Sequence, residues 1–307
     1  MSSEEQRHNE VYITELVREL ATEVLVKFPA TSNMITDHLP RVIAHLNLFC
    51  TFKPDSLLGI PSVTPHIMRV IVFTKLIPIT DTAVKDLTQP FLQTVQCHAL
   101  LWSLDILHGD ISVTNLMIDP ESKTGVLIDL DLTTVAYNDT IDACPLHGNN
   151  RTGTMVFIAL DLMGRDEDED GLEGKLPMLY RHDLESFCWV FLWICYCYDE
   201  GKCTLRYPFT DWIDTTPEYC RRARLDVRHD LRLANVGPSN SYAWYKDRLL
   251  QVVKYWVSFH INDMDCDPFE EPDEIQMLQS VLGLLPRSPK IEMQWAHTYT
   301  RISPTAK

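Results

Sequence analysis

Residues 107–118 read Leu-His-Gly-Asp-Ile-Ser-Val-Thr-Asn-Leu-Met-Ile, and this stretch carries most of the information about the fold. A histidine lies shortly before the carboxylate of Asp110, and the side-chain amide of Asn115 follows five residues later. The apolar residues that come next predict a short strand, which turns at Asp119 into a second strand that ends at Asp129. A hairpin of this kind brings Asn115 and Asp129 side by side at one end of its two strands, with Asp110 adjacent. This end of the hairpin is called the rim below.

Two carboxylates and an amide on one rim suit phosphoryl transfer. This reaction needs little covalent chemistry from the protein, which positions a hydroxyl beside a carboxylate and holds Mg²⁺ with oxygen ligands. Asp110 would accept or orient the proton of the substrate hydroxyl, while Asn115 and Asp129 would ligate a metal that bridges the nucleotide phosphates. Taken alone, Asp110 and Asn115 are also common turn and cap residues, so the motifs around them decide the interpretation.

These motifs resemble those of protein kinases, and of the fungal-type protein kinases in particular. The pattern His-x-Asp-(x)4-Asn is followed, fourteen residues after the Asn, by an Asp with apolar neighbours. Three more similar stretches occur in family order, namely the hinge-like residues 73–81, Gly153-Thr-Met-Val-Phe-Ile-Ala-Leu-Asp161 and His182-Asp-Leu-Glu-Ser-Phe. The resemblance covers about residues 9–200 and implies an α+β, bilobal protein-kinase-like fold whose C-terminal lobe is mostly helical.

The resemblance implies a set of functional residues and two cofactors, ATP and Mg²⁺. Asp110 is similar to the catalytic base, and Asn115 acts with it in the catalytic loop. Asn115 and Asp129 resemble the metal ligands. Lys75 and Leu76 lie in the hinge-like segment, where the family binds the nucleotide.

Four other positions have supporting roles in the family. Glu10 stands where a helix-borne glutamate pairs with the nucleotide-binding lysine, and Asp161 stands where kinases place a structural glutamate. Asp183 resembles the buried carboxylate that braces the catalytic loop from the central helix. His108 is expected to be a packed structural histidine, because kinase chemistry gives it no role in proton transfer.

Two departures from the family pattern affect function. Gly109 replaces the arginine with which many kinases read a phosphorylated activation loop, so we expect that switch to be absent. A glycine-rich loop and a strand lysine should precede Glu10, yet the first lysine of the sequence is Lys27 and the first glycine is Gly59. We therefore expect an incomplete N-terminal lobe, weak binding of ATP·Mg²⁺ and little or no phosphotransfer by these 307 residues.

Three functional interpretations follow. The first is a protein kinase that transfers phosphate from ATP to Ser or Thr hydroxyls, with its catalytic lobe intact. The second is a pseudokinase, a non-catalytic module that binds a partner protein. The third is a small-molecule kinase of the aminoglycoside or choline type, in which His-Gly-Asp also occurs. The acidic run 166–170 raises the option of basic protein substrates, and the oligomeric state is not addressed by the sequence.

Composition and charge argue against some classes of partner and location. The net charge of -16 argues against nucleic-acid binding, which needs an excess of Lys and Arg. The N-terminal residues 1–10 are polar and acidic and do not resemble a signal peptide, and nine scattered cysteines favour a reducing compartment, either cytoplasm or nucleus. The apolar run 187–198 has only twelve residues, so it predicts a buried helix and not a membrane span.

Periodicity divides the chain into three expected parts. Residues 1–80 form a partial N-terminal lobe with the hinge, 81–286 the C-terminal lobe, and 287–307 a tail. The expected elements, each with its own hydrophobic pattern, are helices at 10–28, 91–102, 187–198, 242–259 and 274–285, a strand at 68–74, and a proline-rich loop between residue 28 and that strand.

Overall fold

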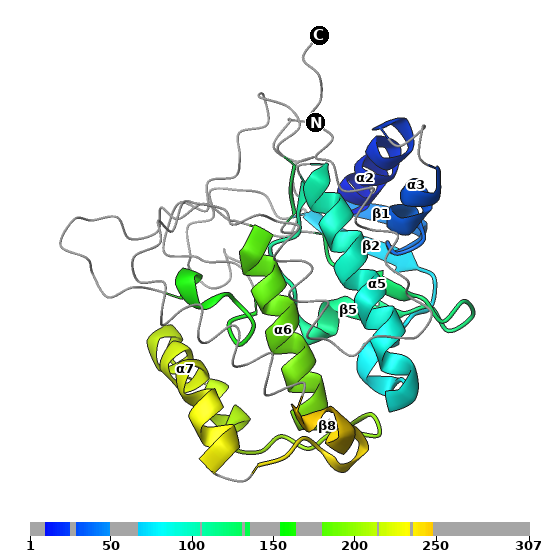
Figure 1. Ribbon diagram of the computed structural model, residues 1–307. Helices are drawn as coiled ribbons and strands as arrows, with labels where there is room; N and C mark the ends of the chain where they lie inside the picture. Colours follow the sequence, from blue (N-terminus) through cyan, green and yellow to red (C-terminus); the bar gives the residue numbers. More distant parts are fainter. Residues whose placement is uncertain are drawn as a thin grey trace, which may run out of the picture.

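The computed structural model gives the chain a mixed helical and stranded architecture. It describes residues 10–24, 29–49, 67–104, 106–130, 133–135, 154–163, 180–213, 215–233 and 236–247. Two long helices, α5 (Val84–Ser103) and α6 (Tyr180–Cys197), run through the middle of the described part. Helices α2 and α3 and strands β1 and β2 gather at one end, and helix α7 (Pro217–Leu233) lies at the other (Figure 1).

The N-terminal end corrects the sequence interpretation in one place. Helix α2 (Glu10–Val24) begins where expected, and residues 25–28 of the helix expected at 10–28 lie outside the described part. The stretch that its prolines marked as loop contains helix α3 (Pro29–Thr36) and strand β1 (Val42–Phe49). Proline is tolerated in the first turn of a helix, because the N–H that it lacks has no partner there, so Pro29 begins a helix and does not prevent one.

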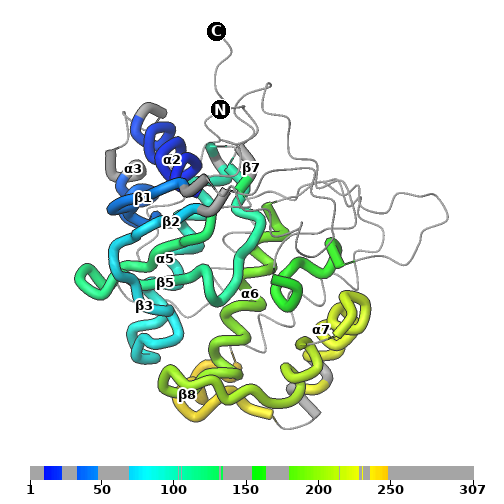
Figure 2. The backbone as a smooth tube through the Cα atoms, turned by 180° about the vertical axis from the view of Figure 1, so that it is seen from behind, coloured from blue at the N-terminus to red at the C-terminus, as the bar shows by residue number. Residues whose placement is uncertain are grey.

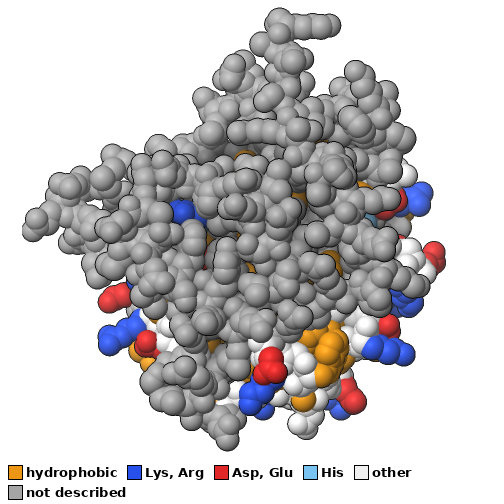
Figure 3. Space-filling model, in the orientation of Figure 1, with side chains coloured by type: hydrophobic (Ala, Val, Ile, Leu, Met, Phe, Trp, Pro, Cys, Tyr) orange, Lys and Arg blue, Asp and Glu red, His pale blue; other side chains and the backbone are white. Residues whose placement is uncertain are grey.

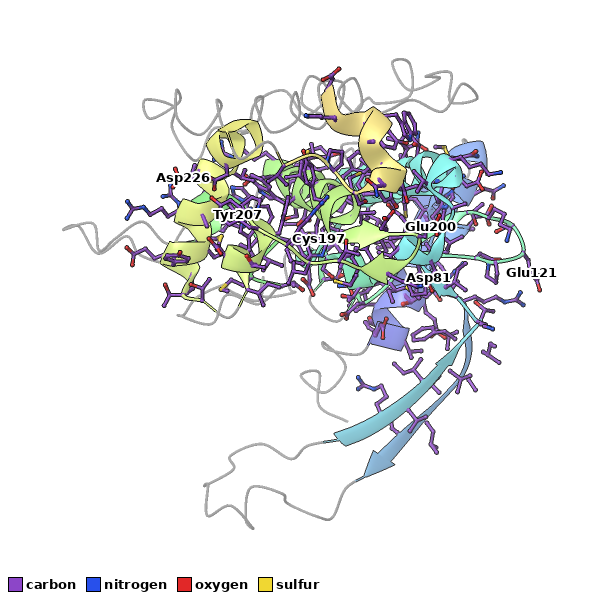
Figure 4. All side chains as sticks on the ribbon, turned by 90° about the horizontal axis from the view of Figure 1, so that it is seen from below. Asp81, Glu121, Cys197, Glu200, Tyr207 and Asp226 are labelled. Carbon is purple, nitrogen blue, oxygen red and sulfur yellow. The ribbon has the colours of Figure 1, made fainter. Side chains whose placement is uncertain are left out.

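Strand β1 pairs antiparallel with β2 (Ile67–Phe73), which confirms the strand expected at 68–74 to within one residue. The two strands form a ribbon that projects away from the rest of the described chain (Figure 4). Leu46 and Val70 are direct partners across the ribbon, and both side chains are exposed. Its far end joins residues that lie outside the described part.

The expected hairpin is present and packs on α5. Strands β5 (Leu116–Ile118) and β6 (Gly125–Leu127) are antiparallel, with Leu116 opposite Leu127. A third short strand, β3 (Ile77–Pro78), pairs with β5 on its other side. Seen from behind, β3 and β5 lie next to α5 (Figure 2). The Asp119 carboxylate accepts the backbone N–H groups of the two residues after Pro120, at 2.7 and 3.1 Å, which fixes the turn.

The central helices contain the core. Helix α5 confirms the expected helix around residues 91–102 and extends it toward the N-terminus. Every residue of α6 is buried, which confirms the buried helix expected at 187–198 as far as Cys197, whereas Tyr198 is half-buried and begins a short strand. Phe91 of α5 packs against Phe187 and Phe191 of α6, with ring centroids 5.9 and 5.0 Å apart. Within the described ranges, no helix has the length and apolar character that crossing a membrane requires.

The remaining elements are short, except for α7. Two further strand pairs occur, β4 (Ile106–Leu107) with β7 (Thr134–Val135) and β8 (Tyr198–Asp199) with β9 (Lys202–Cys203). Helix α7 was not expected from the sequence. The helix expected at 242–259 begins as a 3₁₀ turn, Asn240–Tyr245, and its later residues, like the helix expected at 274–285, lie outside the described part.

The surface shows how the described charges are distributed. Around the rim of the face in Figure 3, Lys and Arg side chains are interspersed with Asp and Glu side chains. The exposed Tyr207 lies close to Asp226 of α7 (Figure 4), and it forms a hydrogen bond with the Asp230 carboxylate that raises the pKa of the phenol. The acidic run 166–170 lies outside the described residues.

Burial of His182 in α6 predicts sensitivity to acid. Burial first, and then the neighbouring Arg181, lower the pKa of the imidazole from 6.5 to about 4. Between these two values the unfolded chain binds a proton that the folded chain does not, so the free energy of unfolding falls as the pH drops from about 6.5 to about 4. The full shift corresponds to a loss of about 3 kcal/mol.

Urea melts at pH 7.0, 5.5 and 4.5 would check this result. We expect His182→Gln to lose less stability across this range than the wild-type chain. Both curves should still fall, because burial also lowers the pKa of His38 and His108. Parallel curves for the two proteins would contradict the prediction.

Candidate functional site

Residues 108–115, the predicted catalytic loop, are held together by contacts with one another. Asp110 is half-buried, and its carboxylate Oδ2 and backbone carbonyl both accept hydrogen bonds from Asn115 Nδ2, at 3.2 and 2.9 Å. The 3₁₀ turn Val113–Asn115 reverses the chain, so that the Asn115 side chain reaches Asp110 five residues earlier. Gly109 has φ 79°, a conformation that glycine adopts without steric cost. The backbone conformation by itself therefore favours glycine at this position, where the family pattern has arginine.

The hairpin brings the rim residues together. The Ile128 N–H donates to the Asn115 carbonyl at 3.0 Å, so the residue before Asp129 continues the strand pairing as far as Asn115. Asp129 itself has φ 66°, the left-handed region that aspartate tolerates better than most residues. Its backbone N–H donates to Glu10 Oε1 at 3.2 Å. Glu10 therefore lies at the same rim, although 119 residues separate it from Asp129.

His108 has a defined tautomer. Its Nδ1 accepts the Asp110 N–H at 3.3 Å, so this nitrogen carries no proton. The proton is then on Nε2, which donates to the Ile128 carbonyl at 3.0 Å. Burial lowers the pKa of the imidazole, which agrees with a neutral ring. His108 therefore joins the catalytic loop to the strand that leads to Asp129, which is a structural task.

Asp183 reaches the catalytic loop from α6. Its Oδ2 accepts the Gly109 N–H at 3.4 Å and lies 2.7 Å from Nε2 of His98 on α5. Asp183 and His98 are both buried. Burial opposes ionisation of Asp183, but the contacts with His98 outweigh it, so the pKa of this carboxyl lies below its ordinary value. His98 was not predicted as part of the site, because it lies among apolar helix residues far from the motif.

Thr154 is the nearest neighbour of Asp110 that the sequence interpretation missed. Its backbone N–H and its hydroxyl both donate to Asp110 Oδ1, at 2.8 and 3.1 Å. The side chain is exposed. Thr154 follows Gly153 in one of the stretches that resemble the family. This motif is the sequence feature from which the role of Thr154 could have been predicted.

Three more predicted residues have separate positions. Asp161 forms an ion pair with Arg181, with Oδ2 and Nη2 3.2 Å apart. Lys75 and Leu76 lie in the connector between β2 and β3, with Lys75 exposed and Leu76 half-buried. They take no part in the hydrogen bonds described for Asp110 and its neighbours.

The donor set fits Mg²⁺. Asn115 Nδ2 is directed at Asp110, so its carbonyl Oδ1 is the atom that could ligate a metal. Asp129 supplies a carboxylate at the same rim. Mg²⁺ in nucleotide sites is bound through one or two carboxylates together with substrate phosphates, and the remaining positions are filled by water. Asn115 and Asp129 could therefore serve as the two protein ligands.

Comparisons with known proteins place this geometry in a family. The model of the family described as fungal protein kinase matches residues 11–195, more than half of the chain. A solved structure, that of vaccinia related kinase 3, matches with 12% sequence identity and a TM-score of 0.48, over 86% of this chain and 71% of that one. Curated proteins give no match. The family match confirms the resemblance and the protein-kinase-like α+β fold, and the chain belongs to the fungal protein kinase family.

Proposed function

We propose that this rim transfers the terminal phosphoryl group of ATP to a Ser or Thr hydroxyl of a protein substrate. The main support is the contact between Thr154 and Asp110. The Thr154 hydroxyl donates to Asp110 Oδ1 at 3.1 Å, the geometry that a substrate hydroxyl needs with a general base. Thr154 and Asn115 thus fix the direction of the Asp110 carboxylate, and a carboxylate has lone pairs beyond those used here that could accept from a substrate hydroxyl.

The other residues of the rim have complementary tasks. Asn115 fixes the carboxylate of Asp110 from the opposite side through Oδ2. Asn115 Oδ1 and the Asp129 carboxylate would hold Mg²⁺, which neutralises phosphate charge when it is bound. Asp110 would accept the proton of the attacking hydroxyl. Lys75 and Leu76 of the connector are proposed to contact the nucleotide, and a basic protein segment is the proposed substrate.

Phosphate incorporation by the purified chain tests this proposal. Assays should use millimolar ATP·Mg²⁺, because we expect weak nucleotide binding, with Ser/Thr peptides of basic, neutral and acidic composition. Asp110→Asn should lower the rate by at least roughly 10²-fold, the contribution expected from a general base. Asp226→Asn, an exposed carboxylate on α7, is the matched control and should leave the rate unchanged.

Three outcomes would contradict the proposal. A rate that Asp110→Asn leaves unchanged would remove Asp110 from the mechanism. Phosphorylation of aminoglycosides or small alcohols in place of peptides would make the chain a small-molecule kinase. Absence of transfer to every acceptor, in a folded chain, would support a non-catalytic module that binds a partner protein.

A further inference from the structure

The backbone of residues 157–163, here called the anchored segment, is held from two helices. Glu185 of α6 accepts the Leu160 N–H through Oε1 at 2.9 Å. Arg224 of α7 donates from Nη1 to the Ile158 carbonyl at 2.6 Å. Arg221 of α7 also donates, from Nε to the Leu160 carbonyl at 3.1 Å. Backbone groups of the segment are thus bonded to charged side chains of both helices, and hydrogen bonds to charged groups are stronger than those to neutral ones.

Glu185 and Arg224 also form an ion pair with each other inside the protein. Arg224 is fully buried, and its Nη2 lies 3.6 Å from Glu185 Oε1. Its guanidinium lies over the ring of Trp189, 4.5 Å from the centroid, and Trp189 Nε1 donates to Glu185 Oε1 at 2.8 Å. Burial lowers the pKa of Arg224 to about 10, which leaves it charged at neutral pH. Buried ion pairs of this kind are often no more stabilising than apolar residues of the same size. A gain in stability alone therefore does not explain why Glu185 and Arg224 form an ion pair here.

The anchored segment leads directly to the rim. Its first residue, Phe157, donates its backbone N–H to the Thr154 carbonyl at 2.8 Å. Thr154 in turn donates twice to the Asp110 carboxylate. We propose that Glu185 and Arg224 are positioning residues for Asp110, because they fix the backbone that holds Thr154 against the carboxylate. This inference rests on the proposed function for its effect on turnover, but not for its effect on the backbone.

The double variant Glu185→Gln/Arg224→Met separates positioning from stability. It leaves no unpaired charge in the core, and glutamine keeps an acceptor for the Leu160 N–H and for Trp189. The Ile158 carbonyl loses its donor. We expect kcat to fall by about 10- to 100-fold, since a misplacement of about 1 Å can cost roughly 10²-fold. The KM for ATP should not change, and the melting temperature should stay near that of the wild type.

Hydrogen exchange provides a readout that does not depend on activity. Amides of Thr154 and of the anchored segment should exchange faster in the double variant, while those of α5 should keep their wild-type rates. Arg222→Met is the matched control, because Arg222 is an exposed arginine of the same helix, and it should change neither measurement. Unchanged exchange in the segment would overturn the inference, whether or not the chain is active.

Two other outcomes are also decisive. Faster exchange throughout both central helices, with a loss of turnover that follows the loss of stability, would show a purely structural role and overturn the inference. Faster exchange confined to Thr154 and the segment, in a chain whose wild type transfers no phosphate, would support the positioning of Thr154 and contradict the proposed function.

If the double variant does not fold, Arg224→Lys decides the question. Its single ammonium keeps a cation beside Glu185 but lacks the forked geometry, so wild-type kcat and exchange in that variant would overturn the inference.

Discussion

Replacing Asp183 by alanine should lower the free energy of unfolding by about 3–5 kcal/mol, the cost of removing one partner of a buried pair. Asp183 is 1% exposed, and its Oδ2 has contacts with His98 Nε2 and with the Gly109 N–H. Without the carboxylate, both groups are left inside the protein with no acceptor, and such unpaired groups keep their full desolvation penalty. Gly109 begins the turn that carries Asp110, so the catalytic loop should also lose its fixed position.

Asp110→Asn is the matched control for this measurement. Asp110 is half-buried, and an amide of the same shape keeps Oδ1 as an acceptor for the Thr154 N–H and hydroxyl. Its NH2 group replaces Oδ2, so the hydrogen bond from Asn115 Nδ2 to that oxygen is lost. We expect the free energy of unfolding to fall by about 1 kcal/mol, the net contribution of one such hydrogen bond. Thermal and urea melts of both variants check the pair. Equal losses would contradict the assignment of a bracing role to Asp183 and a catalytic role to Asp110.

Replacing Gly125 by alanine should cost about 3 kcal/mol, at the upper end for an overpacked site. A Cβ atom at this position would lie 2.0 Å from the Pro90 carbonyl oxygen and 2.8 Å from its carbon, both backbone atoms of α5. Either α5 or β6 must therefore move. The Gly125 N–H donates to Gln93 Oε1 at 3.0 Å and its carbonyl lies 2.6 Å from His38 Nδ1, and a shift would disturb both contacts.

Gly237→Ala is the control for the added methyl group. Among the described residues, apart from its two chain neighbours, none has a heavy atom within 4 Å of a Cβ at that position, so the change should be neutral or stabilising by up to about 1 kcal/mol. Melts of the two variants against the wild type give the comparison. Because β6 leads to Asp129, Gly125→Ala should also lower phosphate incorporation. A Gly125→Ala protein as stable as the wild type would mean that α5 and β6 separate more easily than their packing indicates.

Local patterns account for the parts of the fold that the sequence predicted well. The hairpin between Asn115 and Asp129 follows from two short apolar runs around a turn with its own capping carboxylate at Asp119. Helix α6 was predictable because an apolar run of twelve residues is stable only when protein surrounds it. Helix α7 was missed because it is rich in charged residues, and one of its fully buried side chains is an arginine whose partners come from other elements.

Partners that are distant in the sequence account for most of what was missed at the site. Thr154 meets Asp110 across 44 residues, and His98 meets Asp183 across 85. Neither pair leaves a periodic or spacing signal, because only the packing of separate elements brings them together. Glu185 lay within a family-like stretch, but its partner Arg224 did not.

The sequence by itself determined the local scaffold on which the proposed chemistry rests, because Asp110, Asn115 and Asp129 lie within 20 residues of one another and their spacing is set by one loop and one hairpin. It also determined which helix is central, because hydrophobicity on all sides leaves no other environment. Only the tertiary structure decided what orients Asp110. Its carboxylate direction depends on Thr154, and its loop depends on Asp183 and His108. Such contacts form when helices and loops far apart in the chain pack together, and the free energy of that packing is not encoded in any single stretch.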